Sequence, residues 1–129
     1  MNVITLPDRQ KIFKEEYIPS DIKSVIRVQM LVEQNFREEK SAEFYANMLN
    51  LTVRVLIKIA KAHLGKSVYE LIQDRSYEEA IKLLKYSTIS IKEITYELGF
   101  CDPPYFLRCF KKLTGMLPMT YRKLHQVKD

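Results

Sequence analysis

The sequence predicts an all-α protein with about seven helices. Glycine occurs only three times in the 129 residues, and no run rich in valine or threonine alternates between apolar and polar positions as a half-buried strand would. Apolar residues instead recur at the three- and four-residue spacing of amphipathic helices. The hydrophobic fraction of 47% is ordinary for a globular chain, and the length suits one domain or two very small ones.

The N-terminal part of the chain is expected to contribute one helix. Residues 1–20 have weak periodicity and prolines at positions 7 and 19, so we interpret them as an N-terminal tail or the remnant of a linker. Residues 21–38 carry a regular apolar stripe and should form an amphipathic helix. Its inward side is predicted to consist of Val25, Val28, Val32 and Phe36.

A short helix and a longer one are predicted next. The segment SAEFYANMLNL, residues 41–51, has apolar residues at helical spacing, and Ser41 can cap its first turn. The segment TVRVLIKIAKAHLG, residues 52–65, begins at Thr52, another capping residue. It ends at Gly65, where a left-handed backbone can stop a helix. A short helix, a tight turn and a second helix are typical of a helix-turn-helix unit.

A single long helix is predicted over residues 67–87. Ser67 and Glu70 have the spacing of a capping box, and the run contains neither proline nor glycine. About 18 helical residues would span roughly 27 Å. A stiff connector of this order can hold two helices in neighbouring turns of a B-DNA major groove, which lie about 34 Å apart. Its buried side is predicted to be Leu71, Ile72, Ala80, Leu83 and Leu84.

The second half of the chain repeats the first design fifty residues later. Ser90 and Glu93 again have capping-box spacing, and the short segment that they begin can stop at Gly99. The segment DPPYFLRCFKKLTG, residues 102–115, then aligns with residues 52–65 and ends on glycine in the same way. The predicted organisation is a first helix-turn-helix subdomain over residues 21–66, a linker helix over 67–87 and a second helix-turn-helix subdomain over 88–129.

Positive charge is concentrated in the two repeated segments. The whole chain has a formal net charge of +5. Residues 51–66 contain four Lys or Arg and no Asp or Glu, while residues 99–129 contain six against two, so each segment carries +4. Residues 1–50 carry −1 and residues 67–98 carry −2. Two cationic segments separated by an acidic one predict two contact points for a polyanion.

The second unit contains a long set of spaced residues: Ile94, Gly99, Phe100, Asp102, Tyr105, Phe106, Arg108, Phe110, Lys111, Lys112, Gly115, Pro118, Tyr121 and Arg122. This set resembles the C-terminal signature of AraC/XylS-type transcription regulators. The first unit matches that family more loosely, and the resemblance covers roughly residues 22–126. The sequence departs from the family pattern in the linker helix, where Ser76 stands at a position that often holds arginine.

The resemblance implies both a fold and a function. It implies an all-α domain with two helix-turn-helix units joined by a helix, binding of double-stranded DNA at promoters and contact with RNA polymerase. The chain can be a stand-alone activator or the DNA-binding end of a longer regulator whose sensor domain is missing from it. Residues 1–20 fit a severed linker slightly better.

The two repeated helices supply the candidate residues for contact with DNA. An inward side made of Leu56, Ile59, Ala60 and His63 would leave a basic side of the first helix exposed, and the fifty-residue offset carries that side to the second helix. Arg and Lys suit guanine edges and phosphates. The candidates for base reading are Arg54, Ile57, Lys58, Pro104, Leu107 and Arg108. The candidates for phosphate contact are Lys61, Tyr105, Lys111, Lys112, Arg122 and Lys123.

Each of these candidates also has a purely structural interpretation. The cations can form a solvated face, and we favour partial burial of Ile57 and Leu107 against a neighbouring helix over contact with thymine methyl groups. Pro103 and Pro104 begin the second helix and remove two N–H donors, so this end should read shape or methyl groups more than hydrogen-bond patterns. The aromatic residues predicted to be core are Phe100, Phe106 and Phe110.

The sequence argues against catalysis. His63 and His125 are far apart, no Ser/His/Asp set is present, and Cys101 and Cys109 have no histidine at metal-ligand intervals. No enzyme activity, metal or cofactor is therefore expected. No apolar run reaches the roughly 18 residues of a membrane span, and the first residues do not have the pattern of a signal peptide, so a cytoplasmic location is expected.

The alternative function is a helical protein-interaction module that does not read DNA. Its contact surfaces would be the acidic linker helix and the apolar residues Ile57 and Leu107. The two functions differ in their response to salt, because only DNA binding must weaken steeply as salt competes for the phosphates.

Overall fold

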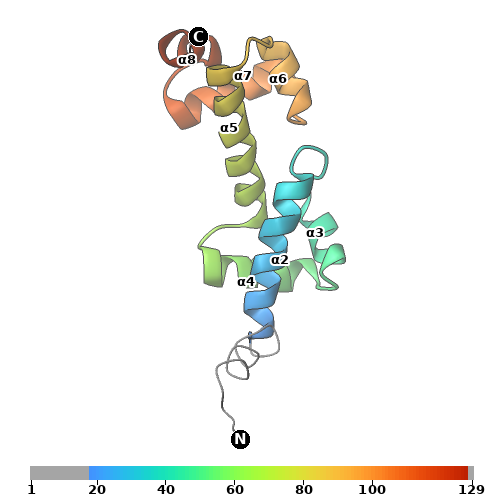
Figure 1. Ribbon diagram of the computed structural model, residues 1–129. Helices are drawn as coiled ribbons and strands as arrows, with labels where there is room; N and C mark the ends of the chain where they lie inside the picture. The colour runs from blue at the N-terminus through green and yellow to red at the C-terminus, as the bar shows by residue number, and fades with distance from the viewer. Residues whose placement is uncertain (1–17, 128–129) are drawn as a thin grey trace, which may run out of the picture.

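The computed structural model describes residues 18–127, which form seven α-helices and no β-strand (Figure 1). The all-α prediction is confirmed. The predicted tail over residues 1–20 lies almost entirely outside the described residues. In the part of the chain that is described, no helix is both long and apolar enough to cross a membrane. The helices are α2 (Ser20–Asn35), α3 (Ala42–Met48), α4 (Val53–Leu64), α5 (Val68–Tyr86), α6 (Ile91–Glu97), α7 (Pro103–Thr114) and α8 (Pro118–His125).

Short-range signals begin and end these helices. A side-chain oxygen accepts a hydrogen bond from a first-turn backbone N–H at five helix starts, which satisfies a donor that the helix leaves unpaired. The capping residues are Ser41, Thr52, Ser67, Ser90 and Asp102. α4 and α7 both end on glycine in the left-handed region, with φ of +69° at Gly65 and +85° at Gly115.

Two three-helix units lie at opposite ends of α5 (Figure 1). In one unit, α2 packs against α4 and against the first half of α5. In the other, α6 packs against α7, and α8 packs against α5. α5 contains 19 residues and therefore spans about 28 Å. α5 is thus shared by the two units and connects them directly.

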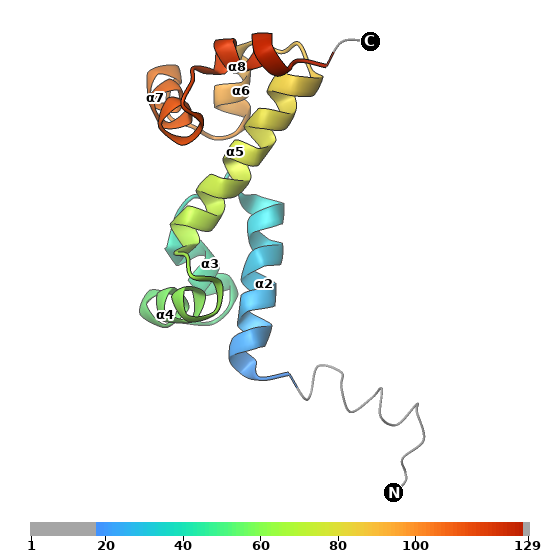
Figure 2. The same ribbon diagram turned by 90° about the vertical axis from the view of Figure 1, so that its left-hand side faces the viewer.

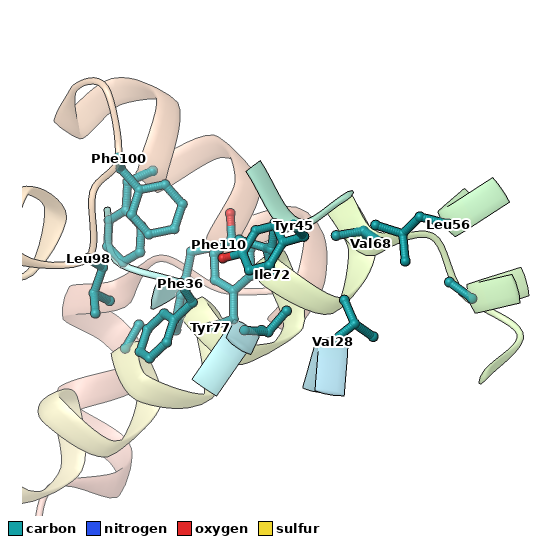
Figure 3. Close-up of a cluster of buried hydrophobic side chains, with 14 of the residues drawn as sticks. Val28, Phe36, Tyr45, Leu56, Val68, Ile72, Tyr77, Leu98, Phe100 and Phe110 are labelled. Carbon is teal, nitrogen blue, oxygen red and sulfur yellow. The ribbon is translucent and has the colours of Figure 1, made fainter. Parts of the chain in front are cut away.

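The hydrophobic core is continuous through both units (Figure 3). Leu56 of α4 and Ile72 of α5 are buried in the first unit, and Tyr77 of α5 extends the core into the second. The ring centroid of Phe106 lies 6.3 Å from that of Tyr77 and 4.9 Å from that of Phe100. The predicted burial is confirmed for Val25, Val28, Val32, Phe36, Phe100, Phe106 and Phe110.

Two parts of the predicted burial pattern are wrong. His63 was expected to face inward, but its side chain is 34% exposed and its Nε2 lies 3.9 Å from Asp21 Oδ2 at the start of α2. The His63 side chain therefore lies at the surface near a carboxylate. In α5, Leu71 and Leu83 flank the core and are only half-buried, whereas the small side chain of Ser76 is fully buried.

Candidate nucleic-acid interface

α4 and α7 lie on the same side of α5 (Figure 2). In this view both helices are seen nearly end-on, so both run across α5 in similar directions, while α2 lies on the opposite side. Each buries one face against its own unit, which leaves the opposite face of each helix free. Two helices with this arrangement can approach one face of an extended, rod-like ligand together.

The free face of α4 is basic with an apolar centre. Leu56, Ile59 and Ala60 form its buried side. Opposite them, Arg54, Lys58 and Lys61 are exposed, together with Ile57, whose side chain is 43% exposed. The favoured interpretation of Ile57 as partly buried against a neighbouring helix is therefore wrong, because its side chain is exposed on the side of α4 that no other helix of residues 18–127 covers.

The free face of α7 follows the same pattern. Phe106 and Phe110 form its buried side, Pro104, Arg108, Lys111 and Lys112 are exposed, and Leu107 is half-buried as expected. Asp102 Oδ1 accepts a hydrogen bond from the Tyr105 N–H at 2.8 Å, so the third N–H of the helix is already occupied. With prolines at the first two positions, this helix start offers no free N–H in its first turn to a phosphate.

A chain of side chains connects α5 to Arg108. The Arg108 guanidinium carbon lies 5.8 Å from the centroid of the Tyr105 ring, and the Tyr105 hydroxyl lies 3.3 Å from that of Tyr69 on α5. Gln73 donates a hydrogen bond to Tyr69. The hydrogen bond with Tyr69 raises the pKa of Tyr105 above its ordinary value. The ring that supports Arg108 is thereby held in place from the linker helix, through a residue, Tyr69, that the sequence did not indicate.

The candidate phosphate contacts at Arg122 and Lys123 have different environments. Arg122 is half-buried, and its guanidinium donates hydrogen bonds to the carbonyls of Ile89 at 2.7 Å, Leu84 at 3.2 Å and Leu83 at 3.3 Å. The carbonyls of Leu83 and Leu84 belong to the last turn of α5, and that of Leu83 also accepts from the Ser87 N–H at 3.0 Å. Arg122 is therefore a structural cap that joins α8 to α5, and its guanidinium is already hydrogen-bonded inside the molecule. Lys123 is exposed on α8.

Replacement of Arg122 by alanine should lower the free energy of unfolding by about 2–3 kcal/mol, because the carbonyls of Leu84 and Ile89 lose hydrogen bonds from a charged donor. Urea denaturation measures this loss. Lys123→Ala, at the exposed neighbouring position, should change stability by less than about 0.5 kcal/mol. An Arg122→Ala protein as stable as the Lys123→Ala protein would contradict the capping role.

Comparison with known proteins identifies the family. The family described as a helix-turn-helix domain matches residues 45–124. An AraC-type DNA-binding regulator from Chromobacterium violaceum has the same fold, with a TM-score of 0.75 over 82% of this chain and 22% identity. The chain belongs to the AraC/XylS family. The resemblance seen in the signature of the second unit is confirmed.

Other known proteins match most of the chain. An uncharacterized HTH-type transcriptional regulator of Bacillus subtilis, YfiF, is 29% identical over 94% of this chain and 38% of its own length. The transcriptional activator RhaS of Mannheimia succiniciproducens is 31% identical over 70% of this chain and 34% of its own. The C-terminal domain of AraT, a response regulator from Geobacillus stearothermophilus, has a TM-score of 0.78 and 28% identity over 82% of this chain and 88% of that domain. This AraC/XylS chain thus spans less than two-fifths of the length of these two curated relatives.

Within the described residues, no group of three or more His, Cys, Asp or Glu is placed to hold a metal ion. Cys101 is exposed and Cys109 half-buried, and both are free thiols. The exposed side chains of the candidate interface on α4 and α7 are cationic and apolar.

Proposed function

We propose that this chain regulates transcription by binding promoter DNA, with α4 and α7 in successive segments of the major groove. The observation that carries the proposal is the placement of two cationic helix faces on one side of a helix of about 28 Å. That length is close to the ~34 Å repeat of the major groove, so both helices can enter from one side of the duplex. RhaS is named a transcriptional activator, and the DNA-binding domain of AdpA, which shares this fold at a TM-score of 0.68 and 19% identity, has been solved with its target DNA.

Within this proposal, the exposed residues divide by the chemistry they offer. Arg54, Lys58 and Arg108 can donate to base edges, and Ile57 with Leu107 can contact thymine methyl groups. Phosphate contacts fall to Lys61, Lys111, Lys112 and Lys123, with the hydroxyl of Tyr105 beside them. Pro104 contributes shape at the start of α7.

The proposal extends to partners and location. A promoter-bound regulator of this kind would contact RNA polymerase and act in the bacterial cytoplasm, where the promoters are. Because the relatives are more than twice as long as this chain, we also propose that a sensor domain accompanies the DNA-binding function.

Selection of bound sequences from random double-stranded DNA tests the proposed function. The expected product is an asymmetric site of about 20 base pairs with two determinants about one helical turn apart, since the two units carry different side chains. A single short determinant would show that only one unit engages the duplex. Recovery of no preferred sequence would contradict sequence-specific binding.

Replacement of Arg108 by alanine should relax the preference at one base pair of the selected site by about 1–3 kcal/mol. The guanidinium is exposed on the free face of α7, where it can form a bidentate contact with guanine. Competition binding against single-base-pair variants of the site measures the change. Arg27→Ala, at an exposed arginine of α2, is the matched control and should leave every preference intact. Equal weakening on all sequences would instead make Arg108 a phosphate contact.

A further inference from the structure

The two units touch at a second place besides α5. The turn that follows α2, residues 36–40, reaches the second unit at the end of α6 (Figure 1). Arg37 Nη1 lies 3.0 Å from Glu97 Oε1 on α6, and its Nη2 lies 3.3 Å from Glu79 Oε2 on α5. Lys40 Nζ donates a hydrogen bond to the Leu98 carbonyl at 2.8 Å. Two cations of the first unit are thus bonded to the end of α6, shortly before α7 begins at Pro103.

The 36–40 turn is fixed to its own unit. Phe36 is buried in the core with 3% of its surface exposed. The Tyr45 hydroxyl of α3 donates to the Glu39 carbonyl at 2.8 Å, which holds the far end of the turn. Because both ends are held, the turn must move together with α2 and α3. A force on Arg37 or Lys40 is therefore transmitted to the first unit as a whole.

Gly99 allows the backbones of the two units to meet. A Cβ atom placed on this glycine would lie 2.0 Å from the Arg37 carbonyl oxygen, far inside van der Waals contact. Gly115 has a similar left-handed φ, but a Cβ there would meet nothing within 4 Å. The glycine at position 99 thus provides room for the 36–40 turn in addition to ending α6.

The charged groups where the 36–40 turn meets α5 and the end of α6 form hydrogen bonds within the protein rather than only with water. Lys40 is half-buried, and burial lowers its pKa to about 8. Burying an ammonium group is costly unless it is hydrogen-bonded, and Lys40 donates both to Leu98 and to the buried Ser76 hydroxyl at 3.2 Å. Arg75 of α5 donates to both carboxylate oxygens of Glu33 on α2, at 2.8 and 2.9 Å, and to Glu79 at 3.0 Å. α2, α5 and α6 are therefore connected through one network.

We propose that the 36–40 turn is a second connection, or tie, between the two units, in addition to α5. This tie fixes the distance and the angle between α4 and α7. It therefore determines which spacing between the two determinants of the DNA site the protein accepts. A single helical connection allows the units to twist and bend about it, whereas a second attachment off its axis prevents both motions. The proposal rests on the proposed function, in which α4 binds one determinant of the DNA site and α7 binds the other. Arg37 and Lys40 act in it as positioning residues that need not touch DNA.

The test uses the site recovered by selection and versions of it with one base pair added or removed between the two determinants. One base pair changes the separation by about 3.4 Å and the relative rotation by about 35°. The wild-type chain should lose at least about tenfold in affinity for either altered site, because rigidly held helices cannot follow the change. The double variant Arg37→Gln/Lys40→Gln should lose less than about threefold in affinity when the original site is replaced by an altered one. It should bind the original site itself several-fold more weakly than the wild-type chain does, because binding must now fix the two units relative to each other.

Two further variants separate this effect from charge and from misfolding. Arg27→Gln/Lys82→Gln removes the same charge from exposed positions on α2 and α5. Its loss of affinity for the altered sites, called here the spacing penalty, should equal that of the wild-type chain. Glu97→Gln removes only one partner of Arg37, and its spacing penalty should lie between those of the wild-type chain and the double variant. Its circular dichroism spectrum should match that of the wild-type chain. A folded Arg37→Gln/Lys40→Gln protein with the full wild-type penalty would overturn the proposal.

A measurement without DNA distinguishes failure of the tie from failure of the proposed function. Residual dipolar couplings of backbone amides report the alignment of α4 relative to α7. One alignment tensor should describe both units of the wild-type chain, and two different tensors should be needed for Arg37→Gln/Lys40→Gln. If the tensors separate as expected but no DNA site is found, the tie stands and the proposed function fails. A single shared tensor in the variant overturns the tie.

Discussion

Gly99→Ala should lower the free energy of unfolding by about 3 kcal/mol or more, a large fraction of the roughly 5–15 kcal/mol that stabilises a domain. Two costs add at this position. The backbone φ of +80° costs a residue with a Cβ about 1–2 kcal/mol. The added methyl group would also lie 2.0 Å from the Arg37 carbonyl oxygen, so the 36–40 turn must move, and such overpacking typically costs a further 1–3 kcal/mol.

Gly115→Ala is the matched control for this variant, because its φ is +85° and its Cβ would meet nothing within 4 Å. It should lose only the conformational part, about 1–2 kcal/mol. The difference between the two midpoints of urea denaturation, at equal m-values, therefore isolates the contact with Arg37. Equal losses in both variants would contradict a close approach of the two units at Gly99.

The starts of the five capped helices followed from the sequence because their causes are local, whereas α2 ends at Asn35, earlier than the predicted residue 38. A cap such as Thr52 or Asp102 acts on N–H groups within three residues, and a left-handed glycine such as Gly65 acts on the turn just before it. All the partners needed for these decisions lie within a few positions along the chain. The fifty-residue repeat then identified α7 from α4, and with it most of the basic face.

Residues whose role depends on distant partners could not be assigned in this way. Arg122 stands in a basic segment and reads as a phosphate contact, yet its three acceptors are 33 to 39 residues earlier in the chain. Arg37 and Lys40 likewise resemble an ordinary solvated charge run, and their partners in α6 are 60 and 58 residues away. Only the packing of the units decides which cations are used inside the molecule and which are free for a ligand.

One departure from the family pattern is explained by the contact between the 36–40 turn and α5. Ser76 stands where the family often has arginine, and it is fully buried with its hydroxyl accepting from Lys40 and donating to the Ile72 carbonyl. Arg75, one position earlier, supplies a guanidinium that bonds Glu33 of α2 instead. The small residue at position 76 leaves room for the Lys40 ammonium group beside α5.

Raising the monovalent salt concentration from 50 to 200 mM should weaken binding to the selected DNA site by about a hundredfold or more. The proposed phosphate contacts include four exposed lysines, namely Lys61, Lys111, Lys112 and Lys123. If each neutralises one phosphate, the logarithm of the binding constant falls with the logarithm of the salt concentration at a slope of about −3.6, which gives this loss over a fourfold change. If Arg54, Lys58 or Arg108 contacts a phosphate instead of a base, the slope is steeper. Fluorescence anisotropy with a labelled duplex measures the slope directly.

Paired lysine variants connect this slope to the proposed face. Lys111→Gln/Lys112→Gln on α7 should reduce its magnitude by about 2, because two fewer counterions are released. Lys23→Gln/Arg27→Gln on α2 removes the same charge from the opposite side of the molecule and should leave the slope unchanged (Figure 2). A slope no steeper than about −1 for the folded wild-type chain would mean that the cations of α4 and α7 do not meet phosphates. The apolar residues between those cations, Ile57 and Leu107, would then be the feature to explain, and a protein partner rather than a duplex would be the ligand that fits them.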